Sequence, residues 1–402
     1  MNRVLFVDDE PRILDGLRRS LHGLFLRWEM EFADSGPEAL RCLERSSYDA
    51  VVADMRMPGT NGLELLEETA RRFPETVRIV LSGQCDRQAL LRAVGVVHHF
   101  LNKPCEPQTL RFALDRAFSL HNWLATQWQR RLVCSVLSIP SSSSLHMRLM
   151  YELEQSDSSI EQVGQIISRD AGMAARVLHL VGSGFFGVPQ HICNPAEAVN
   201  LMGSEMVGLL AFSGWTFSPL PISDSWTPFL ERLIRHSLDV ARAAAAIAEE
   251  ETHDPAVIDR SYLAGLLHES GVLVFARHLT RRYLEVLDAC RLTRSNLWQT
   301  ENRELGIGHA EIGAAVASLS GIAEQVVEAI ALHHCPGRSL DRGFTPLTAL
   351  HIAAVMQSEA LAEGVDFAGG IDVDYLHAIG CADRLSQWRQ ICRATKKEGV
   401  LR

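Results

Sequence analysis

Five polar side chains suited to phosphoryl transfer follow short apolar runs in the N-terminal part of the chain. They are Asp8, Asp9, Asp54, Ser82 and Lys103. Each run is short and apolar enough to form a buried strand. The carboxyl ends of parallel strands form the edge at which open α/β sheets bind ligands. We therefore expect these carboxylates, the hydroxyl and the lysine to converge at one site.

The residue types at this predicted site suit phosphorylation of an aspartate. The carboxylates of Asp8, Asp9 and Asp54 are hard oxygen ligands of the kind that Mg²⁺ prefers. The metal would neutralise the charge that builds as a phosphoryl group reaches Asp54. Lys103 adds a positive charge for the phosphoryl oxygens, and Ser82 can donate a hydrogen bond to one of them. One such residue at a strand end is usually a solvated cap, but five in this order favour a protein controlled by phosphorylation of Asp54.

The same stretch resembles the receiver domain of bacterial two-component response regulators over roughly residues 1–120. The resemblance implies an α/β fold with a five-stranded parallel sheet, flavodoxin-like (βα)₅, and a sensor histidine kinase as the phosphate donor. It also implies that Mg²⁺ is held by Asp9, Asp54 and the backbone carbonyl of Arg56. Helical apolar spacing at 11–24, 36–45, 62–73 and 86–94 agrees with this fold.

Two further features follow from the resemblance. The bond between Lys103 and Pro104 is expected to be cis, because an X–Pro bond adopts this form at low cost. Phe100 would be the aromatic residue that turns inward together with Ser82 when Asp54 is phosphorylated.

Length and composition frame the rest of the chain. At 402 residues it suits two or three domains. The net charge of −10 comes without a basic stripe, so DNA binding is not expected. The nine cysteines include no Cys-x-x-Cys pair, and the sequence has neither a signal peptide nor a run of eighteen apolar residues. We therefore expect a cytoplasmic protein that does not enter a membrane.

A helical apolar pattern begins at Pro107 and continues past the end of the first predicted domain. Its members recur at spacings of three and four: Leu110, Leu114, Ala117, His121, Leu124, Trp128 and Leu132. Such a seam suits packing against a second helix, within the chain or in a homodimer, and an amphipathic helix of the second domain is the alternative. The expected division is a receiver at 1–120, a helical connector at 121–140, a helical output domain at 141–365 and a helical extension at 366–402.

The second half of the sequence predicts an all-α bundle, because amphipathic segments separated by Gly, Pro and Asn follow one another without a period-two strand. Histidines stand at the ends of several of these segments. The candidate metal ligands among them and beside them are His236, His268, Glu269, His309, His333 and His334. Imidazole and carboxylate ligands suit Fe, Mn or Zn, whereas helix capping or burial in the core is the plain alternative.

In their order, these histidine-containing segments resemble the HD superfamily of metal-dependent phosphohydrolases. Upstream segments at 166–170, 178–187 and 198–203 resemble its HDOD branch, a helical output module of bacterial signalling proteins, over roughly 135–365. The sequence departs from the hydrolases in three places. The His-Asp pair is His268-Glu269, a later Asp is replaced by Ala354, and the Gly-Tyr-Pro word of the HD-GYP relatives does not follow His334.

These departures favour an output domain that works by binding a downstream protein partner. Two alternatives stay open. One is a metal-dependent cyclic-di-GMP phosphodiesterase of HD-GYP type, in which the metal would activate water on a phosphodiester. The other is an effector that binds a cyclic dinucleotide without cleaving it.

Overall fold

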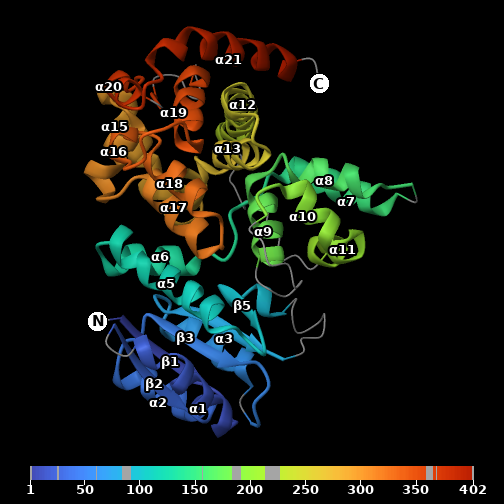
Figure 1. The fold of residues 1–402 in the computed structure, drawn as a ribbon, viewed down its shortest axis with the longest axis vertical. Coiled ribbons are helices and arrows are strands. Elements are labelled where there is room, and N and C mark those ends of the chain that lie inside the picture. Colours follow the sequence, from blue (N-terminus) through green and yellow to red (C-terminus); the bar gives the residue numbers. More distant parts are fainter. Residues whose placement is uncertain are drawn as a thin grey trace.

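The computed structural model describes residues 2–24, 27–59, 61–83, 92–155, 157–182, 192–212, 227–358, 365–367 and 369–400. An N-terminal α/β domain is followed by a larger helical domain, and α5 and α6 lie between them (Figure 1). All but the end of the helix expected at 86–94 lies outside the described residues.

The N-terminal domain is built on a parallel sheet of five strands in the order β2-β1-β3-β4-β5. The strands are β1 (Asn2–Val7), β2 (Trp28–Ala33), β3 (Ala50–Asp54), β4 (Val77–Ser82) and β5 (His99–Asn102). Every residue of β3 and β4 is buried, as expected for central strands with helices on both faces. The predicted five-stranded parallel fold is therefore confirmed.

The helices described around this sheet are α1 (Pro11–Ser20), η1 (His22–Leu24), α2 (Gly36–Arg45), α3 (Gly62–Arg72) and α5 (Pro107–Trp123). Helix α3 starts directly against the end of β3. A Cβ added to Gly62 would lie 1.8 Å from the carbonyl oxygen of Asp54, so glycine is needed for this close approach. Asn61 and Glu64 form a capping box that fixes where the helix begins.

The apolar pattern that starts at Pro107 forms two helices, where the sequence suggested one continuous segment. Helix α5 ends at Trp123, and α6 (Gln127–Ser135) begins after an extended Leu124. The break occurs because Thr126 starts a new helix, with its backbone N–H donating to the side chain of Gln129. Helix α5 packs on β3 and β5, and both α5 and α6 contact α17, so part of the seam packs within the chain.

The remainder of the described chain is helical, as predicted. Its elements are α7 (Ser143–Glu154), α8 (Ile160–Ile167), α9 (Ala171–Gly182), α10 (Pro195–Met202), α11 (Ser204–Phe212), α12 (Thr227–Thr252), α13 (Pro255–Leu267), α14 (Ser270–His278), α15 (Thr280–Thr293), α16 (Leu297–Leu305), α17 (His309–Leu319), α18 (Glu324–Leu332), η2 (Pro336–Arg338), α19 (Pro346–Gln357), α20 (Val373–Ala378), η3 (Ala382–Arg384) and α21 (Leu385–Val400). The helical part also contains an isolated β-bridge between Asn296 and Asp366.

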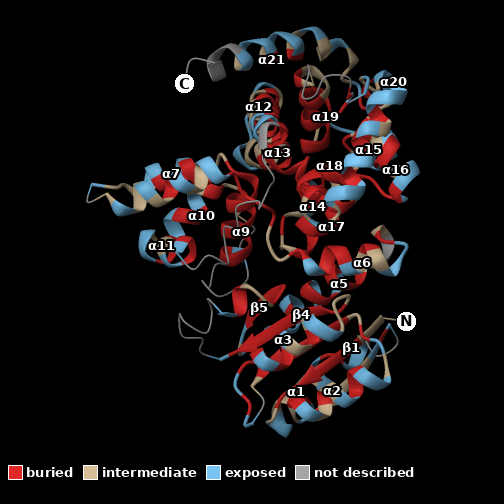
Figure 2. Ribbon diagram, turned by 180° about the vertical axis from the view of Figure 1, so that it is seen from behind, coloured by how far each residue is buried: buried red, intermediate tan, exposed pale blue. Residues whose placement is uncertain are grey.

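The core of the helical domain is formed by helices that are apolar on more than one side. Figure 2 shows burial along α9, α17, α18 and α19, and nearly every residue of α17 is buried. The long helix α12 packs against α13, α19 and α21. Trp388 of α21 is fully buried and donates its indole N–H to Glu251 at 2.8 Å, which ties the C-terminal helix to α12. None of the described helices is both long and apolar enough to cross a lipid bilayer.

Candidate functional sites

Three of the five predicted phosphoryl-transfer residues meet in direct contact at the carboxyl edge of the sheet. Asp8 follows β1, Asp54 ends β3, and Lys103 follows β5. The Nζ atom of Lys103 lies 2.6 Å from Asp8 Oδ2 and 2.7 Å from Asp54 Oδ1. Partial burial opposes the charge of Lys103, but hydrogen bonds and charges from Asp54 and Asp8 outweigh it and hold the pKa of Lys103 above its ordinary value.

The second oxygen of each of these carboxylates is held by the backbone. Asp54 Oδ2 accepts the N–H of Arg56 at 3.1 Å, and Asp8 Oδ1 accepts the N–H of Glu10 at 3.0 Å. Asp9 lines an open pocket beside Asp54 together with Arg56 and residues of the loop that leads into α3. The predicted acidic residues are thus gathered at one accessible edge of the sheet.

Ser82 and Phe100 lie on the neighbouring strands of the same edge. Ser82 ends β4 opposite Asn102 of β5, and its carbonyl accepts the N–H of Lys103 at 2.8 Å. Phe100 pairs with Val80, two residues before Ser82, and is 4% exposed, so its side chain is buried in this structure. The bond between Lys103 and Pro104 is cis, which confirms that prediction.

The candidate metal ligands of the helical domain also come together, and helix ends position most of them. His236 lies on α12, His268 ends α13, Glu269 precedes α14, His309 begins α17, and His333 and His334 follow α18. We call these six residues the histidine cluster. Glycine brings two of the helices into contact, since a Cβ on Gly271 of α14 would lie 2.0 Å from the carbonyl oxygen of His309.

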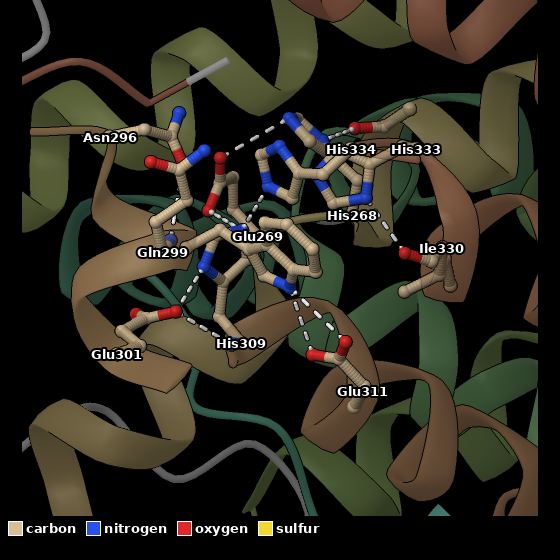
Figure 3. A network of polar contacts seen from close by, with 12 residues as sticks. His268, Glu269, Asn296, Gln299, Glu301, His309, Glu311, Ile330, His333 and His334 are labelled. Carbon is tan, nitrogen blue, oxygen red and sulfur yellow. Dashed lines mark hydrogen bonds and ion pairs between the residues drawn. The ribbon is translucent and has the colours of Figure 1, made fainter. Parts of the chain in front are cut away.

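Glu269 lies between two imidazoles of the histidine cluster (Figure 3). Its Oε1 is 3.5 Å from His268 Nε2, and its Oε2 is 3.5 Å from His309 Nε2. His334 Nε2 is 2.9 Å from His309 Nε2. The longer glutamate in place of the expected aspartate therefore still reaches the centre of the cluster.

The outward-facing nitrogens of His268 and His333 are tied to helix carbonyls. Nδ1 of His268 donates to Gly265, and Nδ1 of His333 donates to Ile330, each at 2.7 Å. This leaves Nε2 of both rings as the acceptor nitrogen, which is how metal-binding histidines are oriented. Nε2 of His268, Nε2 of His333 and Oε2 of Glu269 are buried and find no hydrogen-bond partner among the described residues. The ligand atoms of the cluster form two triads, each within 4.8 Å: His236, His268 and Glu269 in one, and His309, His333 and His334 in the other. Each triad contains at least one of these unsatisfied acceptors, which fits a bound cation.

The protonation of the cluster follows from its burial and its two carboxylates. Burial lowers the pKa of His333 to about 3 and raises the pKa of Glu269 to about 7. Burial also lowers the pKa of His268 well below its usual range. For His309, burial opposes protonation, but Glu301 and Glu269 outweigh it and raise the pKa to about 9. The lone pairs of His268 and His333 are therefore available near neutral pH, and a metal would displace the Nε2 proton of His309.

Glu301 is the polar residue at this site that the sequence analysis missed. It lies on α16, is fully buried, and accepts the Nδ1 proton of His309 at 2.6 Å. The signal was present in the spacing of Leu297, Glu301 and Leu305, which places a carboxylate on the apolar face of the helix.

The position at which the HD hydrolases carry a later aspartate, Ala354 in this chain, lies on α19. Ala354 is buried on α19 and offers no ligand atom. The nearby His351 is a satisfied core residue, since Nδ1 donates to the carbonyl of His333 at 2.8 Å and Nε2 accepts the N–H of Asp372 at 3.0 Å. The cavity beside Glu269 measures about 10 Å³, which is room for one water-sized sphere.

Two family models match the chain, one for each domain. Residues 4–115 match the model of the response regulator receiver domain, and residues 139–336 match the model of the HDOD domain. The chain therefore contains a response regulator receiver domain followed by an HDOD domain. Receiver domains generally bind Mg²⁺ and receive their phosphoryl group from histidine kinases.

Relatives of this receiver–HDOD chain match different shares of its length. The hydrogenase transcriptional regulatory protein HoxA of Cupriavidus necator is 39% identical over 109 residues, which are 27% of this chain and 22% of HoxA. An uncharacterized protein of Treponema pallidum is 28% identical over 198 residues, which are 49% of this chain and 37% of that protein. The chain thus spans less than half the length of either relative. A virulence factor of Campylobacter jejuni shares the fold, with a TM-score of 0.50 and 16% identity over 69% of this chain and 99% of that chain.

Two buried arginines join the receiver to the HDOD domain. Arg116 on α5 donates to the carbonyls of Ser318 at 3.1 Å and Ile322 at 2.9 Å, at the C-terminal end of α17. Arg176 on α9 donates to the carbonyls of Leu137 at 2.7 Å and Val94. Burial lowers the pKa of each arginine to about 10, which still leaves both charged at neutral pH.

A pair of histidines lies between the same two domains. The ring of His99 on β5 lies 6.0 Å from the ring of His179 on α9, measured between centroids. His179 donates Nδ1–H to the carbonyl of Ser320 at 2.9 Å. His99 is the neighbour of Phe100, so the strand that carries the predicted switch residue also contacts the HDOD domain.

Proposed function

We propose that Asp54 accepts a phosphoryl group from a sensor histidine kinase and that its phosphorylation controls the HDOD domain. The observation that carries this proposal is the position of Lys103 Nζ, 2.7 Å from Asp54 and 2.6 Å from Asp8. The lysine is placed to pair with an incoming phosphoryl oxygen. Mg²⁺ would be held by Asp8, Asp9, Asp54 and the backbone carbonyl of Arg56, and would neutralise the charge of the transferred group.

The path from Asp54 to the HDOD domain runs along β4 and β5. A phosphoryl group on Asp54 would draw Ser82 and Lys103 toward its oxygens, and both residues are tied to β5 through the backbone. Movement of β5 would shift Phe100 and its neighbour His99, which lies against His179 of α9. The proposed output is a change in this domain contact, which alters the surface that the HDOD domain presents to a downstream protein.

The test of this proposal is phosphoryl labelling of the full chain by a small-molecule phosphodonor in the presence of Mg²⁺. We expect one phosphoryl group per chain, located on Asp54 by mass spectrometry of proteolytic fragments. Labelling at a different residue, or none at all, would refute the assignment.

A second proposal is that the histidine cluster binds a divalent transition metal. This proposal is supported by three buried acceptor atoms without hydrogen-bond partners, on His268, His333 and Glu269. The imidazole-rich donor set favours Zn or Fe over Mg²⁺ or Ca²⁺, with Mn also compatible. Such an ion would supply Lewis-acid chemistry, but the missing carboxylate at Ala354 favours a structural or sensing role over phosphodiester hydrolysis.

Elemental analysis of the purified chain tests the second proposal. We expect stoichiometric Zn, Fe or Mn in the wild type and loss of this metal in His268→Ala, because the variant removes a ligand from the centre of the cluster. His377→Ala is the matched control, since His377 is exposed on α20, outside the cluster. If the wild type binds none of these metals after incubation with them, the histidines are core residues only.

A further inference from the structure

We propose that Glu301 is a positioning residue that sets the metal affinity of the histidine cluster by holding His309. The inference rests on the second proposal above, that the histidine cluster binds a metal. Glu301 is not a ligand in this account; it acts through the imidazole of His309.

The contacts of Glu301 immobilise one histidine in two ways. Its Oε2 accepts the backbone N–H of His309 at 2.7 Å and the Nδ1–H of the same residue at 2.6 Å. The first bond satisfies one of the free N–H groups at the start of α17. The second fixes the ring relative to that helix. A single carboxylate therefore sets both where α17 begins and where the imidazole points.

The other oxygen of Glu301 is fixed as well. Oε1 accepts the hydroxyl proton of Tyr283 at 2.5 Å, and both residues are fully buried. Three donated hydrogen bonds on one buried carboxylate leave it little freedom to rotate. Because Glu301 is held in place, its two hydrogen bonds to His309 hold the imidazole in one orientation.

The chemical consequence appears at the opposite nitrogen of His309. With Nδ1 held by Glu301, Nε2 faces Glu269 at 3.5 Å and His334 at 2.9 Å (Figure 3). A carboxylate on the outer nitrogen makes an imidazole a stronger electron donor to a metal than a neutral carbonyl does. His268 and His333 have backbone carbonyls in that position. Of these three histidines, His309 has a carboxylate, that of Glu301, on its Nδ1 atom. We therefore expect His309 to contribute more to metal affinity than His268 or His333.

A buried ion pair that only stabilises the fold would use the same contacts, so the test must separate the two roles. Glu301→Gln keeps the size of the side chain and one acceptor oxygen but removes the charge. Glu304→Gln is the matched control, because Glu304 is an exposed residue on the same helix. Metal-free full-length protein is titrated with Co²⁺, and its visible absorption spectrum and its thermal unfolding without metal are recorded.

We expect Glu301→Gln to weaken Co²⁺ binding by about tenfold to a hundredfold and to alter the visible spectrum, whereas Glu304→Gln binds as the wild type does. Tyr283→Phe leaves the carboxylate in place and should show a smaller loss in the same direction, so it serves if Glu301→Gln does not fold. Wild-type affinity and spectrum in a folded Glu301→Gln would overturn the positioning role and leave the metal site standing. No Co²⁺ binding by the wild type would overturn the metal site and this inference together.

Discussion

The Asp54→Asn variant is expected to take up no phosphoryl group under conditions that label every wild-type chain. The amide has no nucleophilic carboxylate oxygen, although it keeps the shape of Asp54 and an oxygen that accepts the N–H of Arg56. Lys103 keeps its contact with Asp8, so no buried charge is left without a partner. The measurement is the mass of the intact protein before and after treatment with the phosphodonor.

Asp15→Asn is the control for this experiment, since Asp15 is an exposed aspartate of α1 that pairs with Arg18. It should be labelled to the wild-type level. Both variants should show the wild-type urea midpoint, which would show that a loss of labelling reflects chemistry and not unfolding. Stoichiometric labelling of Asp54→Asn would contradict the account of the receiver site.

The free energy of unfolding is expected to fall steeply with acid because three histidines are buried uncharged at or near the domain contact. Burial lowers the pKa of His98, of His99 and of His179, and for His179 the value is about 3, with Arg176 as the next cause. In the unfolded chain these rings titrate near their ordinary value of 6.5. Below that pH the unfolded chain binds protons that the folded chain does not, so stability is present above pH 6.5 and is lost as the pH falls toward the folded pKa.

For His179 alone the loss is about 1.4 kcal/mol for each pH unit below its unfolded pKa. Urea unfolding followed between about pH 7 and pH 5 measures it, because this interval spans the titration of an unperturbed histidine. His179→Phe loses the bond to Ser320 and is less stable at every pH, but its stability should depend less steeply on pH. Equal slopes in the variant and the wild type would show that His179 is charged in the folded protein.

Much of the receiver site could be predicted because local sequence determines it. Asp54 and Lys103 come directly at the ends of apolar runs, and parallel strands bring such ends to one edge whatever the rest of the chain does. The histidines of the cluster could be found for a similar reason, since several lie at helix ends that the periodicity already marks.

Other features depend on tertiary contacts that no local pattern encodes. The arginines Arg116 and Arg176 have the spacing of ordinary helix residues, and only the packed domains show that both bind backbone carbonyls across the contact. The end of α5 at Trp123 was missed because the apolar spacing continues through the break, while Thr126 competes locally by starting a new helix. Glu301 was missed because its partner His309 lies on the next helix.

The central claim is that the chemistry at Asp54 controls the contact between the receiver and the HDOD domain. Hydrogen–deuterium exchange of the full chain tests it most directly, with and without phosphodonor and Mg²⁺, once labelling has been confirmed by mass. We expect phosphorylation to change the exchange of backbone amides in β5, in α9 and at the C-terminal end of α17, where Arg116, Arg176 and the ring of His179 contact the other domain. Asp54→Asn should show no change under the same treatment. Identical exchange in these segments for phosphorylated and unphosphorylated protein would contradict the claim.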